Sequence, residues 1–356
     1  MKMTFRWFGE GNDSVSLADI KQIPGVDGIV WALHDVPAGE AWPMKRILEV
    51  KQQADAWGFH IDVVESLNVH ESIKMGTSDR DGYIHNYIKT IDRLGNAGVK
   101  VICYNFMPVF DWVRTELFHE LEDGSTALFF SKETIETIAP EALVERVTAN
   151  SEYTIAGWEP ERLHELNAVL EAYKNITEDD LFENLKYFLE SIGPVCTANN
   201  IKMAIHPDDP PWSIFGLPRI VTGKENLKRL IELVDEPFNG LTLCTGSLGS
   251  NPGNDVVDLI KTFMHRIYFA HVRNVRICDN GNFVETSHRA RDGSIDIVSV
   301  MKAYNDAGFD YYIRPDHGRH LWNEDSRPGY GLYDRALGIM YMHGIWDTLD
   351  RLQAEE

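Results

Sequence analysis

Short apolar runs alternate with amphipathic stretches along almost the whole chain. The apolar runs are rich in β-branched and aromatic residues, as strands buried on both faces of a parallel sheet are. The stretches between them space their apolar residues as helices do, and several end at a glycine, such as Gly58 or Gly98, which is typical of a helix C-terminus. The runs predicted as strands span eight ranges: 3–8, 26–33, 59–66, 99–106, 202–207, 240–246, 266–274 and 311–317.

This alternation predicts an α/β fold, a (β/α)8 TIM barrel, as a single domain over residues 1–356. A length of 356 residues is ordinary for one such barrel with an insertion. The alternative is an open, doubly wound sheet. Against it, no G-x-G-x-x-G follows the first predicted strand, and polar residues follow many strands rather than one switch point. The pattern therefore favours the closed barrel.

One segment interrupts the alternation. Residues 111–180 separate the fourth predicted strand from its expected helix, and the ranges 134–147 and 159–173 within it have helical periodicity. Insertions that follow a barrel strand lie on the catalytic face. We therefore expect a helical insertion there, serving as a lid or as a contact between subunits.

Composition and net charge limit the partners and the cellular compartment that the sequence favours. The net charge of −21 argues against a nucleic-acid partner and favours a soluble cytoplasmic protein. No apolar run approaches the roughly 18 residues needed to cross a bilayer, and no secretory signal is expected. The cysteines show no paired spacing, which indicates free or metal-bound thiols in a reduced compartment; they are Cys103, Cys196, Cys244 and Cys278.

Metal-type side chains lie toward the carboxyl end of each of the last four predicted strands: His206, Cys244, His271 and Asp316. Any one of them alone is more often a packed or hydrogen-bonded residue. In a barrel, however, the carboxyl ends of distant strands meet on one face, so their joint occurrence predicts a four-ligand site for a divalent transition metal. A mixed set of sulfur, nitrogen and oxygen donors accepts Zn²⁺, Fe²⁺ or Mn²⁺. Coordination of substrate oxygens would favour Mn²⁺ or Fe²⁺, and structural zinc would usually use several closely spaced cysteines.

Candidate proton carriers and substrate contacts lie beside these ligands. His317 follows Asp316, and Tyr330 lies between two glycines; we expect an acid/base pair, although Tyr330 could also be a packed loop aromatic. Arg273 and Arg319 are candidate carboxylate clamps, with a surface ion pair as the alternative for each. Other strand ends offer polar side chains that could bind hydroxyl groups or cap loops: His34, Asp35, Glu65, Ser66 and Asn105.

At these positions the sequence resembles the mannonate dehydratase family, which belongs to the xylose-isomerase-like barrels of bacterial hexuronate breakdown. The resemblance extends from about residue 3 to residue 350. It is carried by the strings WALHDVP, VESLNVHESIK, AIHPDDPPWSIFGLPRI, LCTGSLG, FAHVRN, RPDHGR and PGYGLYDRALG.

The resemblance implies a hydro-lyase that converts D-mannonate to 2-dehydro-3-deoxy-D-gluconate in glucuronate catabolism, with Mn²⁺ or Fe²⁺. It implies that His317 and Tyr330 transfer protons and that Arg273 contacts the substrate. It also implies that the metal is held by His206, Cys244, His271 and Asp316. We expect a homodimer that acts on this small sugar acid.

Three other functions compete with this one. A metal-dependent sugar isomerase or epimerase on the same scaffold would lean on carboxylates, whereas this chain offers a cysteine and two histidines. A non-catalytic sugar-acid sensor would lack a complete ligand set or the proton carriers. An endonuclease of similar architecture would present a basic face, which the net charge disfavours. The dehydratase is therefore the favoured interpretation.

Overall fold

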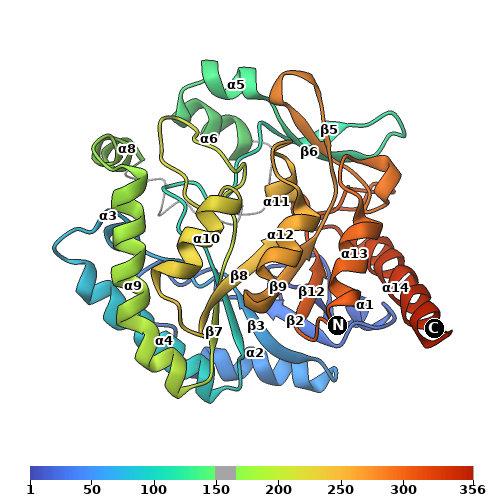
Figure 1. Ribbon diagram of the computed structural model, residues 1–356, viewed down its shortest axis with the longest axis horizontal. Helices are drawn as coiled ribbons and strands as arrows, with labels where there is room; N and C mark the ends of the chain where they lie inside the picture. The colour runs from blue at the N-terminus through green and yellow to red at the C-terminus, as the bar shows by residue number, and fades with distance from the viewer. Residues whose placement is uncertain (149–165, 356) are drawn as a thin grey trace.

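Eight parallel strands close into a barrel, in the order β1, β2, β3, β4, β7, β8, β9 and β12, with β12 pairing back to β1 (Figure 1). The computed structural model describes residues 1–148 and 166–355. Each barrel strand falls within or next to a predicted range, so the predicted TIM barrel is confirmed. The bounds are β1 Lys2–Arg6, β2 Gly28–Trp31, β3 His60–Glu65, β4 Val101–Tyr104, β7 Lys202–Ile205, β8 Asn239–Cys244, β9 Ile267–Val272 and β12 Tyr312–Pro315.

The barrel strands are buried on both faces, which explains their near-continuous apolar character. Every residue of β8 and of β9 is buried. Their register brings Cys244 level with His271, and His271 level with Arg314 of β12. Parallel register therefore sets the polar residues at the carboxyl ends of these strands side by side.

Helices surround the barrel and lie antiparallel to the strands that they connect, as in Figure 1. Capping residues define where several of them begin. Thr177 and Asp180 form a capping box at the start of α9, and Asp296 caps α13. Within the described ranges, no helix has the length and apolar character needed to cross a membrane. The bounds are α1 Leu17–Lys21, α2 Met44–Ala56, α3 Glu71–Met75, α4 Arg80–Asn96, α9 Glu178–Ala198, α10 Lys224–Leu233, α11 Thr245–Gly249, α12 Val256–Phe263, α13 Ile297–Asp306 and α14 Leu332–Glu355.

The insertion after β4 is not wholly helical, and that part of the prediction is wrong. It opens with an antiparallel hairpin of β5 (Glu116–Glu120) and β6 (Thr126–Phe130). Gly124 adopts a positive φ of 80° in the turn, a conformation that favours glycine. The hairpin was missed because its strands are short and β5 is largely exposed, so its pattern is weak.

Helices follow the hairpin, as the periodicity predicted. The predicted helix over 134–147 is divided into α5 (Lys132–Thr137) and α6 (Pro140–Thr148). Pro140 begins the second helix, where a missing N–H costs nothing, and it could not continue the first. The predicted helix over 159–173 is confirmed as α8 (Leu166–Tyr173), and its first part lies outside the described residues.

A second sheet joins the insertion to another loop. The strands β10 (Val275–Ile277) and β11 (Phe283–Glu285), which follow β9, complete a sheet of order β10, β11, β6 and β5. Both the insertion and this loop leave the carboxyl ends of barrel strands. The sheet therefore lies over that end, near α5 and α6 at the top of Figure 1.

Candidate active site

The four predicted metal ligands meet at the carboxyl end of the barrel. One donor atom from each of them lies within 4.8 Å of the others, in a group formed by His206, Cys244, His271 and Asp316. Cys244 and His271 are fully buried, and Asp316 is 3% exposed. His206 Nε2 lies 3.2 Å from His271 Nδ1. The geometry that a four-ligand site requires is therefore present.

The charges around Cys244 favour its thiolate. Burial raises the pKa of a thiol, but Arg273 and hydrogen bonds from the two histidines outweigh burial here and lower the pKa of Cys244 to about 5. Burial lowers the pKa of His206, and the hydrogen bond to Cys244 together with the negative charges outweighs that effect and raises it to about 9. At neutral pH the protein alone therefore holds a thiolate beside an imidazolium.

Two ligands are held in place by neighbouring side chains. Ser247 donates to the Cys244 sulfur through its backbone N–H at 3.4 Å and its hydroxyl at 3.1 Å. Glu65 Oε1 lies 3.4 Å from His271 Nε2. The same Nε2 accepts a hydrogen bond from Arg314 Nε at 3.2 Å, and the other ring nitrogen, His271 Nδ1, faces the ligand group.

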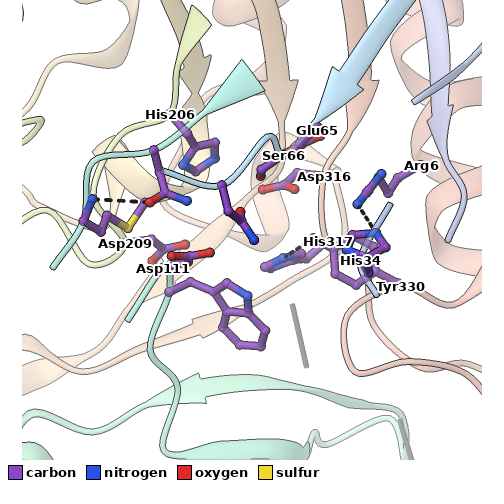
Figure 2. A pocket seen from close by; sticks show the side chains of 14 residues that line it. Arg6, His34, Glu65, Ser66, Asp111, His206, Asp209, Asp316, His317 and Tyr330 are labelled. Atoms are coloured by element: carbon purple, nitrogen blue, oxygen red, sulfur yellow. Dashed lines mark hydrogen bonds between the residues drawn. The ribbon is translucent and has the colours of Figure 1, made fainter. Parts of the chain in front are cut away.

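A cavity opens beside this group, as Figure 2 shows. It holds about 610 Å³ of space that protein atoms do not fill, part of it open to solvent. The predicted polar residues His34, Glu65, Ser66 and Asn105 all line it, whereas Asp35 pairs with Arg46 at 2.8 Å. The other lining residues are Arg6, Asn68, Met107, Asp111, Trp112, His206, Asp209, Asp316, His317 and Tyr330.

Arg6 is a lining residue that the sequence analysis missed. It is buried at the end of β1, and its guanidinium donates to His34 Nε2 at 2.8 Å and to the Val30 carbonyl at 3.3 Å (Figure 2). Burial, and then the positive charge of Arg6, keep the pKa of His34 well below its usual value. Arg6 is the single lysine or arginine among the described lining residues. An arginine inside the apolar run TFRWF was the signal that could have found it.

The two predicted proton carriers contact each other in the cavity. His317 Nε2 lies 3.2 Å from the Tyr330 hydroxyl, and His317 Nδ1 lies 2.9 Å from Glu285 Oε1. Burial, and then the negative charge of Asp316, raise the pKa of Tyr330, so the phenol stays protonated in the protein alone. The protonated hydroxyl of Tyr330 can therefore donate a hydrogen bond into the cavity.

Arg273 and Arg319 do not line the cavity. The buried Arg273 guanidinium pairs with Asp209 and Glu285, and its Nε lies 2.8 Å from Asp316 Oδ2. Arg319 pairs with Asp334 at 2.9 Å and with Asp123 at 3.0 Å. Both arginines form ion pairs in this structure, but the pairs of Arg273 are buried rather than at the surface.

Arg273 is enclosed because its side chain packs under the turn that follows β8. A Cβ added to Gly246 would lie 2.4 Å from Arg273 Cγ. The absence of a side chain at Gly246 thus leaves room for the Arg273 side chain beside this turn. Sequence spacing places Arg273 near the site but does not indicate where its side chain packs.

A buried ion pair that the sequence analysis also missed links the two sides of the barrel. Arg314 of β12 donates to both Glu65 oxygens at 3.0 Å and lies 2.9 Å from Asp316 Oδ1. Burial raises the pKa of a carboxyl, but Arg314 and His271 outweigh burial and hold the pKa of Glu65 well below its usual range. Glu65 is therefore ionised at the edge of the cavity.

Solved structures named as xylose-isomerase-like barrels share this closed parallel barrel. A xylose-isomerase-like TIM barrel protein from Mycobacterium smegmatis, solved with magnesium, matches with a TM-score of 0.56 over 98% of this chain and 97% of its own. The two sequences are only 14% identical, so this likeness shows the fold alone.

The particular family follows from closer relatives. The family model described as D-mannonate dehydratase (UxuA) matches residues 1–356, and the chain belongs to this family. It is 62% identical to mannonate dehydratase 1 of Halalkalibacterium halodurans, over 99% of this chain and 98% of that one, and 54% identical to mannonate dehydratase of Bacillus subtilis, over 100% and 99%. The crystal structure of mannonate dehydratase from Streptococcus suis serotype 2 matches with a TM-score of 0.91 at 45% identity, over 99% and 96%. The predicted family, and with it a carbon–oxygen lyase, is confirmed.

Proposed function

We propose that this protein removes water from D-mannonate to give 2-dehydro-3-deoxy-D-gluconate, with Mn²⁺ or Fe²⁺ held by His206, Cys244, His271 and Asp316. The observation that carries the proposal is the buried ligand group at the barrel mouth, beside a histidine and a tyrosine in hydrogen-bond contact. Family membership over the whole chain supports the same reaction.

The donor set fits a divalent transition metal. It offers a thiolate, two imidazoles and a carboxylate, which together suit Fe²⁺, Mn²⁺ or Zn²⁺ better than Mg²⁺ or Ca²⁺. When bound, such an ion supplies Lewis-acid stabilisation of the negative charge that develops as the proton α to the substrate carboxylate leaves. The side chains of this chain then have to move the protons and orient the sugar.

His317 and Tyr330 divide the proton transfers. Because Glu285 accepts at His317 Nδ1, the Nε2 lone pair faces the cavity, where it can accept the C2 proton. The Tyr330 hydroxyl is protonated and can donate to the departing 3-hydroxyl group. We therefore assign His317 as the base and Tyr330 as the acid.

The polar lining from the first half of the chain orients the substrate. Arg6 and His34 lie together on one side of the cavity, away from His206 (Figure 2). Ser66 and Asn105 offer hydroxyl and amide groups that suit sugar hydroxyls. We assign Arg6 and these polar residues, with Glu65, to substrate binding, and we assign Arg273 and Arg319 to holding other side chains.

The direct test is to reconstitute the protein with Mn²⁺ or Fe²⁺ and to incubate it with a panel of hexonates, measuring the 2-keto acid formed. D-mannonate should react, and its C2 or C3 epimers should react more slowly. In His317→Ala, exchange of the C2 proton should stop together with turnover. Absence of product from D-mannonate with either metal would overturn the proposal.

We also propose that the chain acts as a single catalytic domain in a cytoplasmic homodimer. One continuous hydrophobic cluster takes in residues of the barrel and of the insertion, which supports a single domain. The described cysteines are free thiols, in keeping with a reducing compartment. Light scattering of the purified protein checks the assembly.

A further inference from the structure

Glu285 lies behind the proposed base, on the second sheet rather than on the barrel. It is the last residue of β11 and is 1% exposed. Its Oε1 accepts from His317 Nδ1 at 2.9 Å, from Arg114 Nη2 at 2.7 Å and from Arg273. Its Oε2 has no hydrogen-bond partner among the residues that the structure describes. One carboxylate oxygen thus receives three donors.

The two arginines that bind this carboxylate come from different parts of the chain. Arg114 comes from the insertion after β4 and also binds Asp209, through Nη1 at 2.8 Å and Nη2 at 3.1 Å. Arg273 follows β9, pairs with the same Asp209 and approaches Asp316 with its Nε. All of these side chains are buried. Bidentate contacts of this kind fix geometry as well as charge.

We propose that Glu285 is a positioning residue, which holds the His317 ring with its Nδ1 protonated and its Nε2 directed at Tyr330 and the cavity. A neutral imidazole carries one proton, and a carboxylate acceptor at Nδ1 keeps that proton there. The proposal rests on the proposed role of His317 in proton transfer. It also connects the second sheet with the reaction centre, because Glu285 of β11 and the neighbouring Arg114 complete the surroundings of the base.

A purely structural role for Glu285 makes a different prediction. If it only neutralised Arg114 and Arg273, its loss would disturb the fold, the metal content and substrate binding together. A positioning role should instead lower kcat while leaving KM and metal content nearly unchanged. The split between these quantities separates the two roles.

The variants Glu285→Gln and Glu285→Ala test this on the metal-loaded enzyme. The glutamine oxygen can accept from the same three donors, and its NH₂ group takes the place of the unpartnered Oε2. We expect kcat to fall about tenfold in Glu285→Gln and about a hundredfold or more in Glu285→Ala, within the range for proton-transfer groups. KM and bound metal should stay within about twofold of the wild type in the glutamine variant, which would thus partly rescue the alanine variant.

Glu116→Gln is the matched control. Glu116 lies on β5 of the same sheet and contacts His119 Nδ1 at 2.9 Å, but this pair is partly exposed and does not line the cavity. Its kcat should equal that of the wild type. If Glu285→Ala does not fold, the kcat, KM and metal content of Glu285→Gln test the proposal on their own.

Two results would overturn the proposal: an unchanged kcat in Glu285→Gln, or a loss of metal or a rise in KM that parallels the fall in kcat. His317→Ala separates this failure from that of the underlying assignment. Full turnover in His317→Ala would show that His317 is not the base. If His317→Ala were inactive and Glu285→Gln fully active, only the positioning role of Glu285 would be excluded.

Discussion

The two halves of the barrel present different chemistry at the same end. The strands β7, β8, β9 and β12 end in the ligand group and lead to His317, whereas β1 to β4 end in Arg6, His34, Glu65, Ser66 and Asn105. The first set joins a thiolate, imidazoles and a carboxylate in a buried cluster. The second set lines the cavity with groups that suit hydroxyls and an anion.

This difference indicates a division of work. The half that follows the insertion holds the metal-type donors and the proposed base, and the half before it holds the residues that we propose bind the substrate. Changes in the former should act on metal content and kcat, and changes in the latter on KM. Arg314 and Glu65 link the halves through one buried ion pair, so the division is not complete.

The largest effect should come from Cys244→Ser. A serine hydroxyl is not ionised at neutral pH, so the site loses an anionic donor that the protein holds as a thiolate. We expect metal affinity to fall more than about a hundredfold, with turnover falling in parallel. Elemental analysis and a 2-keto acid assay measure both. Cys103→Ser is the control, because Cys103 is buried within the barrel but lies outside the ligand group. A Cys244→Ser protein with full metal content and full turnover would contradict the assignment.

Tyr330→Phe should show the next largest effect. It removes the hydroxyl that contacts His317 and leaves the ring in place. We expect kcat to fall about a hundredfold, with KM and metal content nearly unchanged. Steady-state kinetics measure the change. The exposed Tyr333→Phe is the control. A kcat within about twofold of the wild type would mean that another group, not Tyr330, acts as the acid.

Arg6→Gln tests the half of the barrel formed by β1 to β4. It removes the charge of the single basic lining residue in the described part of the chain. A charge-assisted hydrogen bond contributes about 1.5–3 kcal/mol, so KM for D-mannonate should rise about tenfold or more while metal content stays constant. Arg46→Gln, an exposed arginine paired with Asp35 outside the cavity, is the control. If Arg6→Gln instead released the metal, the division between the halves would fail.

The last prediction concerns the pH dependence of metal binding, which changes gradually with each pH unit. His206 must lose its proton to bind a metal, and its pKa is raised to about 9 while that of Cys244 is lowered to about 5. Between these values, binding should release about one proton, and affinity should fall about tenfold for each pH unit below 9. Above pH 9 the affinity should level off, and below pH 5 it should fall more steeply. Calorimetry in buffers of different ionisation enthalpy counts the protons, and zero release at pH 7 would contradict the imidazolium–thiolate pair.

The meeting of the four candidate ligands could be predicted because each is a distinctive donor at the end of an apolar run, as His206 and Cys244 are. The ion pairs of Arg273 with Asp209 and Glu285 could not be predicted, because the direction of its side chain depends on the packing against Gly246. Glu285 escaped notice because it lies on a strand of only three residues in the second sheet, which is too short to show a pattern in the sequence. Its importance is visible only beside His317.

The amino-acid sequence alone determined the barrel, the order of its strands and the identity of the donors, because hydrophobic periodicity and local residue chemistry are properties of neighbouring positions. It also carried the resemblance to the family. Only the tertiary structure decided which arginines face the cavity, that a second sheet covers the barrel mouth, and that Glu285 stands behind His317. These depend on packing between segments far apart in the chain, where burial and the nearest charged neighbour, not sequence spacing, set the role of each side chain.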